Sequence, residues 1–314
     1  MSGRTARQRG GWARTVRVAV STAVGAAVAL AATGSAAAVG APPTPDILGA
    51  PTLVAHTAHG DVGYREVGEG SPILLIAGRG MSMDGWAPGF VDGLAAHHRV
   101  VVFDNAGIGA TAAPAGPLTV PGMADQTSAL IAALHLRRPT VLGWSLGGMV
   151  AQALAVRHPG QVGRLVLAAT QSGTGAALPV PPAAAAALDS PIPAVRMAVL
   201  FPADQGSAAL AYLTDVSRYP HFYGASAAVK SAQDTALHEW MAGQDPAGRR
   251  LGRIHAPTLV ADGAEDQLDP SANDHQLRDA VHGARLVLYP DAGHAFLFQD
   301  AAAFVPTVEV FAGR

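Results

Sequence analysis

Residues 143–147, Gly-Trp-Ser-Leu-Gly, could present a nucleophilic serine at the end of a strand. An apolar pair precedes them at 141–142, and a segment with a helical pattern begins directly after the serine, at 146–157. A tight strand-to-helix turn holds the serine hydroxyl clear of the backbone, and the flanking glycines let strand and helix approach closely. The pattern therefore predicts Ser145 as a nucleophile. The alternative is a tight turn with an incidental serine.

Two further polar segments also follow predicted strands. Asp266 lies in Gly-Ala-Glu-Asp after a strand at 258–261, and His294 lies in Asp-Ala-Gly-His after a strand at 285–288. Loops beyond the carboxyl ends of parallel strands meet at one edge of the sheet. There His294 could act as a base for the serine, oriented by Asp266. Three neighbouring carboxylates compete for the role of the acid: Asp262, Glu265 and Asp269.

The chain offers little sign of any other chemistry. It contains no cysteine, which excludes disulfides, thiolate metal sites and a cysteine nucleophile. The other eleven histidines have no spacing typical of a metal site. We therefore expect neither a metal nor a cofactor.

Alternating strands and helices surround these segments. Short apolar runs bounded by Gly, Pro or Asp predict strands at 52–57, 62–67, 73–77, 100–103, 141–142 and 165–169. Helical patterns lie between the later runs, at 90–97, 123–136 and 146–157. This alternation predicts an α/β fold whose sheet is mostly parallel and covered by helices on both faces.

The alternation of strands and helices is interrupted in residues 172–252, which we call the cap segment. An Ala- and Pro-rich stretch opens it, and helical patterns follow at 208–216 and 225–241. Six aromatic residues give it apolar surface to pack, which argues against a disordered loop: Phe201, Tyr212, Tyr219, Phe222, Tyr223 and Trp240. We predict a helical cap here, inserted into a core formed by 52–171 and 253–314.

The chain order Ser145, Asp266, His294 is that of the α/β-hydrolase family. From about residue 52 onward the chain resembles that superfamily, in particular its branch of bacterial serine esterases, cofactor-free haloperoxidases and aclacinomycin-methylesterase-like enzymes. The matching segments are ILLIAGRGMSMDGW, VVVFDNAGIGAT, VLGWSLGGMVAQALAVRHP, PTLVADGAEDQLDP and YPDAGHAF.

The resemblance implies an α/β-hydrolase fold and an oxyanion hole built from backbone N–H groups. Arg79 and Leu146 match the family's donors. Two departures stand out. Ala77 replaces the usual histidine before the oxyanion loop, and Ala106 stands where relatives often carry arginine.

The N-terminal residues look like an export signal. Residues 1–38 contain five arginines, then a weakly apolar run, then Ala-Ala-Ala as a cleavage site, and they contain no Arg-Arg pair of the twin-arginine type. A Pro-rich linker is predicted at 39–51. The sequence thus predicts a secreted protein with no stable membrane span after signal removal. An uncleaved anchor is the alternative.

Removal of residues 1–38 takes five of the 21 basic residues and leaves all 23 acidic ones, so the net charge changes from −2 to −7. Such a chain is a poor ligand for nucleic acid, which needs a basic face.

We therefore expect a secreted hydrolase of a small-molecule ester that has an apolar part. The enzymatic alternatives are a cofactor-free haloperoxidase or perhydrolase, and an aminopeptidase of the proline iminopeptidase type. The last would need cap carboxylates to hold an ammonium group, and Glu239 is the only glutamate in the cap segment. The alternative outside catalysis is a ligand receptor that keeps this fold.

Overall fold

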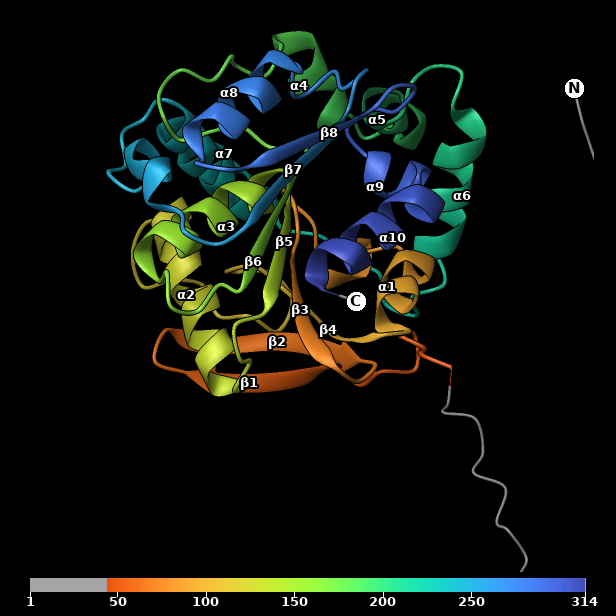
Figure 1. Cartoon of the computed structure of the whole chain (residues 1–314). Coiled ribbons are helices and arrows are strands. Elements are labelled where there is room, and N and C mark those ends of the chain that lie inside the picture. Colours follow the sequence, from red (N-terminus) through yellow and green to blue (C-terminus); the bar gives the residue numbers. More distant parts are fainter. Residues whose placement is uncertain (1–43, 314) are drawn as a thin grey trace, which may run out of the picture. The chain divides into compact units, whose positions relative to one another are not determined.

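The computed structural model of the protein describes residues 44–313, and in them eight strands form one sheet (Figure 1). The strand order is β1-β2-β4-β3-β5-β6-β7-β8. Strands β1 and β2 are antiparallel to their neighbours, and the pairs from β4 onward are parallel. The bounds are β1 Leu53–Thr57, β2 Gly60–Val67, β3 Ser71–Ile76, β4 His98–Phe103, β5 Thr140–Trp144, β6 Arg164–Ala168, β7 Thr258–Gly263 and β8 Arg285–Tyr289.

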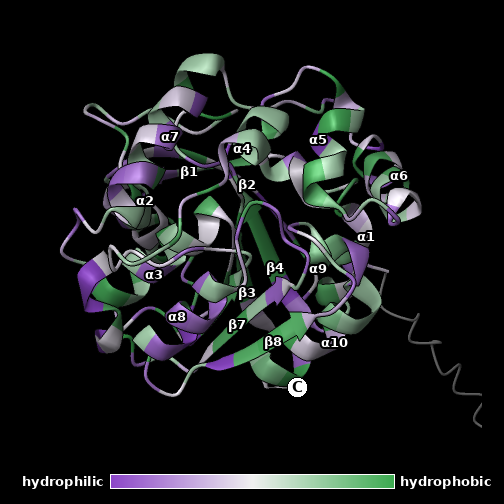
Figure 2. Ribbon diagram, turned by 90° about the horizontal axis from the view of Figure 1, so that it is seen from above, coloured by the Kyte–Doolittle hydropathy of each residue, from purple (hydrophilic) through white to green (hydrophobic). Residues whose placement is uncertain are grey.

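Side chains alternate across this sheet and build a core on each face. In β3, Ile73 and Leu75 belong to one buried cluster, and Leu74 and Ile76 belong to the other. Helices α1 (Pro88–Ala95) and α10 (Ala301–Ala312) complete the first cluster; α2 (Val120–Ala133), α3 (Leu146–Arg157) and α8 (Ala272–Ala280) complete the second (Figure 1). The predicted α/β fold, with a mostly parallel sheet between two helical layers, is confirmed. Figure 2 shows the strands as mainly hydrophobic and the outer helices as mixed.

The cap segment carries four α-helices between β6 and β7: α4 (Pro182–Leu188), α5 (Pro193–Leu200), α6 (Gly206–Val216) and α7 (Ala227–Met241). The last two lie close to the helical patterns of the sequence. The first two were not predicted, because their stretch is rich in Ala and Pro and has no clear apolar period. Both begin with proline at the first helical position, where the missing N–H costs nothing.

Tyrosine hydroxyls attach the cap segment to the core. Tyr212 and Tyr219 donate hydrogen bonds of 3.0 Å to the carbonyl oxygens of Gly85 and Trp86. Tyr223 donates one of 2.7 Å to the Asp104 carboxylate. These three partners lie in the loops after β3 and β4, so the cap segment docks at the carboxyl ends of those strands.

The chain before β1 also packs on the core. Ile47 is fully buried, and its N–H donates a 2.8 Å hydrogen bond to Asp92 in α1. This described part of the predicted linker 39–51 thus packs against the fold. The predicted signal peptide 1–38 lies outside the described residues. Within 44–313, no helix is both long enough and apolar enough to cross a membrane.

Candidate active site

Ser145 lies on a strained turn between β5 and α3. Its backbone dihedrals, φ 56° and ψ −122°, fall in a region that residues other than glycine rarely adopt, and such strain is typical of functional sites. Three hydrogen bonds hold the turn. The Ser145 N–H donates to Ala168 in β6 at 2.9 Å, while the Ser145 carbonyl oxygen accepts from Gly148 N–H at 2.8 Å and from the Thr170 hydroxyl at 2.7 Å.

Glycine is required on both sides of this serine. A Cβ atom on Gly143 would lie 2.2 Å from the carbonyl oxygen of Gly147, and one on Gly147 would lie 2.0 Å from the carbonyl oxygen of Ile76. Both distances are far below van der Waals contact. The strand and helix therefore meet as closely as the sequence motif predicts.

Asp266 and His294 meet at the same edge of the sheet. The Nδ1 atom of His294 lies 2.6 Å from the Oδ2 atom of Asp266. The other oxygen of Asp266 accepts from the N–H groups of Leu268, at 2.6 Å, and Asp269, at 2.9 Å. The Asp266 side chain is fully buried and that of His294 is 6% exposed, so their contact lies almost entirely out of bulk water.

The loop that carries His294 is tied to the serine turn. The indole N–H of Trp144, the residue before Ser145, donates a 2.9 Å hydrogen bond to the carbonyl oxygen of His294. The two rings lie 5.7 Å apart. On its other side the loop contacts the cap segment, because Ala295 N–H donates to the carbonyl oxygen of Leu200 at the end of α5.

The rival carboxylates do not bond to His294. Glu265 is exposed, Asp262 accepts from Gly263 N–H at 2.7 Å, and Asp269 accepts from the Asn273 amide at 2.7 Å. Among the three sequence candidates and Asp266, the structure thus brings only Asp266 to the histidine.

Asp262 and Asp269 instead join Asp274 in a buried group. One oxygen of each lies within 4.8 Å of the others, and within residues 44–313 this is the one group whose spacing could hold a metal ion. Carboxylate oxygens are ligands of the kind that Ca²⁺ prefers. Burial, with repulsion from Asp266, raises the pKa of Asp274 to about 8, and burial also raises the pKa of Asp262 and Asp269 well above their ordinary range. Protons therefore neutralise part of this charge near neutral pH.

The loop after β3 lies against the serine. A Cβ atom on Gly78 would lie 3.3 Å from the Cβ of Ser145, so the loop approaches the nucleophile closely at the residue before Arg79. Leu146 is the first residue of α3, where backbone N–H groups have no partner within the helix. Leu146 thus lies on the serine turn, and Arg79 lies one residue beyond the point where the loop after β3 approaches Ser145.

Asn105 takes part in holding this loop, although the sequence analysis gave it no role. Its amide donates a 2.9 Å hydrogen bond to the carbonyl oxygen of Ala77, the residue that replaces the family's histidine. Its neighbour Asp104 is fully buried and accepts from Met83 N–H at 2.8 Å. Asp104 and Asn105 thus make these hydrogen bonds without the arginine that relatives often carry at position 106. The sequence could have indicated both residues, because they are polar and come immediately after the strand predicted at 100–103.

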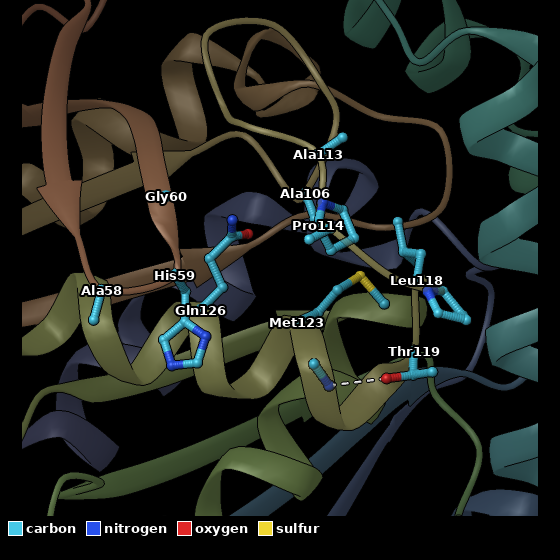
Figure 3. Close-up of a pocket in the computed structure, with 13 residues that line it drawn as sticks. Ala58, His59, Gly60, Ala106, Ala113, Pro114, Leu118, Thr119, Met123 and Gln126 are labelled. Carbon is cyan, nitrogen blue, oxygen red and sulfur yellow. Dashed lines mark hydrogen bonds between the residues drawn. The ribbon is translucent and has the colours of Figure 1, made fainter.

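A separate cavity of about 450 Å³ lies between the β1–β2 turn and α2 (Figure 3). Its lining includes His59, Ala113, Met123 and Gln126, and none of the predicted catalytic residues. It is therefore distinct from the site at Ser145.

Comparison with known proteins gives the family of the chain. A family model described as "alpha/beta hydrolase fold" matches residues 71–301. BpoC of Mycobacterium tuberculosis (strain ATCC 25618 / H37Rv), named as a non-heme bromoperoxidase, is 32% identical over 265 residues, which cover 77% of this chain and 94% of BpoC.

Two other similar proteins were found at comparable coverage. The poly(3-hydroxyalkanoate) depolymerase of Ectopseudomonas oleovorans is 29% identical, with 77% of this chain and 84% of that protein covered. The solved structure of an alpha/beta hydrolase fold protein from Chitinophaga pinensis has a TM-score of 0.74 and 26% identity, with 85% of this chain and 99% of that chain covered.

Proposed function

This chain belongs to the α/β-hydrolase fold family, and on that premise we propose that it is a serine hydrolase that cleaves a carboxylic ester. Hydrolase activity in general follows from its relatives. The ester class, the roles of individual residues and export are the proposal. The observation that carries it is the 2.6 Å contact of Asp266 with His294, on a loop bonded to the turn that strains Ser145.

The proposed reaction follows from these positions. His294 takes the proton of the Ser145 hydroxyl, whose oxygen attacks the ester carbonyl, and Asp266 orients the imidazole and stabilises its charged form. His294 then returns the proton to the leaving alcohol. A water molecule repeats the cycle on the acyl-enzyme and releases the acid.

Negative charge develops on the carbonyl oxygen during both steps. The N–H groups of Arg79 and Leu146 are the proposed donors to it. A preorganised donor of this kind contributes about 2.7 to 4 kcal/mol to the stabilisation of the transition state.

The names of two relatives support acyl transfer at this site, and each name supports a different acceptor of the acyl group. The name of the poly(3-hydroxyalkanoate) depolymerase supports an ester substrate. The name of BpoC supports the second candidate, in which peroxide replaces water on the same acyl-enzyme and a peracid leaves. Aryl-ester turnover measured with and without hydrogen peroxide, with the peracid trapped by halide oxidation, separates the two classes.

A fluorophosphonate probe tests the nucleophile. We expect it to label Ser145 in the folded protein and to fail with Ser145→Ala, and we expect the same substitution to abolish turnover of an aryl ester. Labelling at another serine, or an active Ser145→Ala variant, contradicts the assignment. Retained binding of small esters with no turnover in the wild type favours the ligand receptor.

Export is proposed on the pattern of residues 1–38. Expression in a host with a general secretion pathway should yield a mature protein in the medium or cell envelope whose N-terminal residue is Val39. An intact N-terminus on a membrane-bound protein supports the uncleaved anchor.

A further inference from the structure

Arg79 has two different contacts, one through its backbone and one through its side chain. Its backbone lies in the loop that touches Ser145, and its side chain reaches into the cap segment. Asp234 in α7 accepts from its Nε and, at 2.7 Å, from its Nη2. Asp189, the residue after α4, accepts from Nη1 at 2.7 Å and from Nη2 at 3.1 Å. One guanidinium is thus held bidentately by two carboxylates.

The guanidinium is also protected from solvent. The Arg79 side chain is 12% exposed, while those of Asp234 and Asp189 are 37% and 52% exposed. Arginine presents a planar fork of donors that matches carboxylates on both edges, so the geometry of the loop is defined more tightly than a single ammonium group would allow.

The residues after Arg79 are bound by the same part of the cap segment. Gly80 N–H donates a 2.7 Å hydrogen bond to the side chain of Gln233, the neighbour of Asp234 in α7. The carbonyl oxygen of Gly80 accepts from Ala225 N–H at 3.0 Å, and Met81 forms a bridge with Gly224. The loop that approaches Ser145 at Gly78 is therefore held by the cap segment at the next three residues, Arg79, Gly80 and Met81.

From this arrangement we infer that Asp234 and Asp189 are positioning residues for the oxyanion hole. They hold Arg79 so that its backbone N–H stays aimed at the developing charge, and neither touches the reacting atoms. The inference rests on the proposed function, because it assigns a role in acyl transfer. A hydrogen-bond donor contributes to catalysis only while its direction is fixed before the reaction, so a loosened loop lowers the rate even when substrate still binds.

The experiment compares three variants of the full chain: Asp234→Asn, Asp189→Asn and Asp215→Asn as the matched control. Asp215 in α6 is another cap carboxylate that contacts the core, through Gly89 N–H at 2.8 Å, away from the oxyanion loop. We expect Asp234→Asn to lower kcat by about 10- to 100-fold, less than removal of a whole donor, with KM changed less than about twofold. Because Asp189 is the more exposed partner, Asp189→Asn should cause a smaller loss of kcat. The kcat of Asp215→Asn should stay within about twofold of that of the wild type.

Binding of a boronic acid provides a second measurement. It forms a tetrahedral adduct on the serine, and an oxygen of that adduct occupies the oxyanion hole. We expect Asp234→Asn to weaken the binding of the boronic acid in proportion to its loss of kcat and Asp215→Asn to leave that binding unchanged. Arg79→Lys keeps the charge and loses the planar fork of donors. Its kcat and its affinity for the boronic acid should lie between those of the wild type and those of Arg79→Met.

A purely structural role predicts a different result. Equal losses in Asp234→Asn and Asp215→Asn, a change confined to KM, or full kcat in Arg79→Met would overturn the inference. An inactive wild type that the fluorophosphonate does not label is failure of the proposed function itself. With an active wild type, an unchanged Asp234→Asn rejects the positioning role alone.

Discussion

The indole N–H of Trp144 donates a hydrogen bond of 2.9 Å to the backbone carbonyl oxygen of His294. The two residues are 150 positions apart, and Trp144 directly precedes the predicted nucleophile. The bond therefore couples the position of the proposed base to the position of the serine. It also satisfies a carbonyl group that is buried, since only 4% of His294 and 2% of Trp144 are exposed.

Replacing Trp144 with phenylalanine should reduce both stability and rate. The His294 carbonyl loses its donor, and an unsatisfied buried polar group costs about 1 to 3 kcal/mol. We expect the free energy of unfolding to fall by about that amount and kcat to fall severalfold, because the histidine loop is no longer fixed. Denaturant unfolding and aryl-ester kinetics measure the two effects.

Trp86→Phe is the control for the change in volume. Trp86 is fully buried in the same core, and its indole N–H has no hydrogen-bond partner among the residues that the structure describes. It should lose stability through the cavity while keeping kcat near the wild type. Equal kcat in the two variants would show that the bond to His294 does not matter for the reaction.

Asp266→Asn should be far more damaging to kcat than Asp262→Asn. Only Asp266 bonds to the imidazole, and an asparagine there favours the wrong tautomer; in serine proteases the equivalent change costs about 10⁴-fold. Burial raises the pKa of Asp262, so a neutral asparagine resembles its protonated form and should leave kcat within severalfold. Steady-state kinetics at pH 7 checks this. A larger loss of kcat in Asp262→Asn than in Asp266→Asn would show that Asp266 is not the acid that orients His294.

The sequence could predict the positions of these groups because each follows an apolar strand. Ser145, Asp266 and His294 come after β5, β7 and β8, and parallel pairing brings the ends of those strands to one edge. The contacts of Arg79 were beyond sequence reasoning. Its two carboxylate partners are 110 and 155 residues away, one directly after α4 and the other in α7, in a segment that tyrosine hydroxyls attach to backbone carbonyls of the core. Such contacts leave no periodic pattern in the chain.

Asp274 should make the protein less stable as pH rises. Its pKa is about 8 in the folded state and about 3.9 in an unfolded chain, so the folded form binds the proton more tightly. Its contribution to stability is fully present below about pH 4 and is lost as pH rises through 8. Asp274→Asn cannot ionise, and we expect its melting temperature relative to the wild type to increase between pH 5 and pH 8.8.

Asp279→Asn gives the matched comparison on the same helix. Asp279 is 67% exposed, so its substitution should leave the shape of the melting curve against pH unchanged. A wild type whose melting temperature is flat across this range would show that the buried carboxyls remain neutralised, by a bound cation for example, and added chelator would then restore the slope.

The last prediction concerns the acyl part of the substrate. Two carboxylates of the cap segment beside the oxyanion loop, Asp189 and Asp234, both bind Arg79, so neither is free to hold a substrate ammonium group. The aromatic residues of the cap segment supply apolar surface, so neutral esters with an apolar part should be preferred to cationic substrates. Each methylene that the site buries contributes roughly 0.8 kcal/mol, so kcat/KM for p-nitrophenyl esters should rise about fourfold per added carbon from acetate onward. The rise should stop where the chain meets the cap segment, because overfilling a packed site forces repacking. A kcat/KM that falls from acetate onward, or that favours aminoacyl substrates with a free ammonium group, would exclude an apolar acyl site and support the perhydrolase or the aminopeptidase alternative.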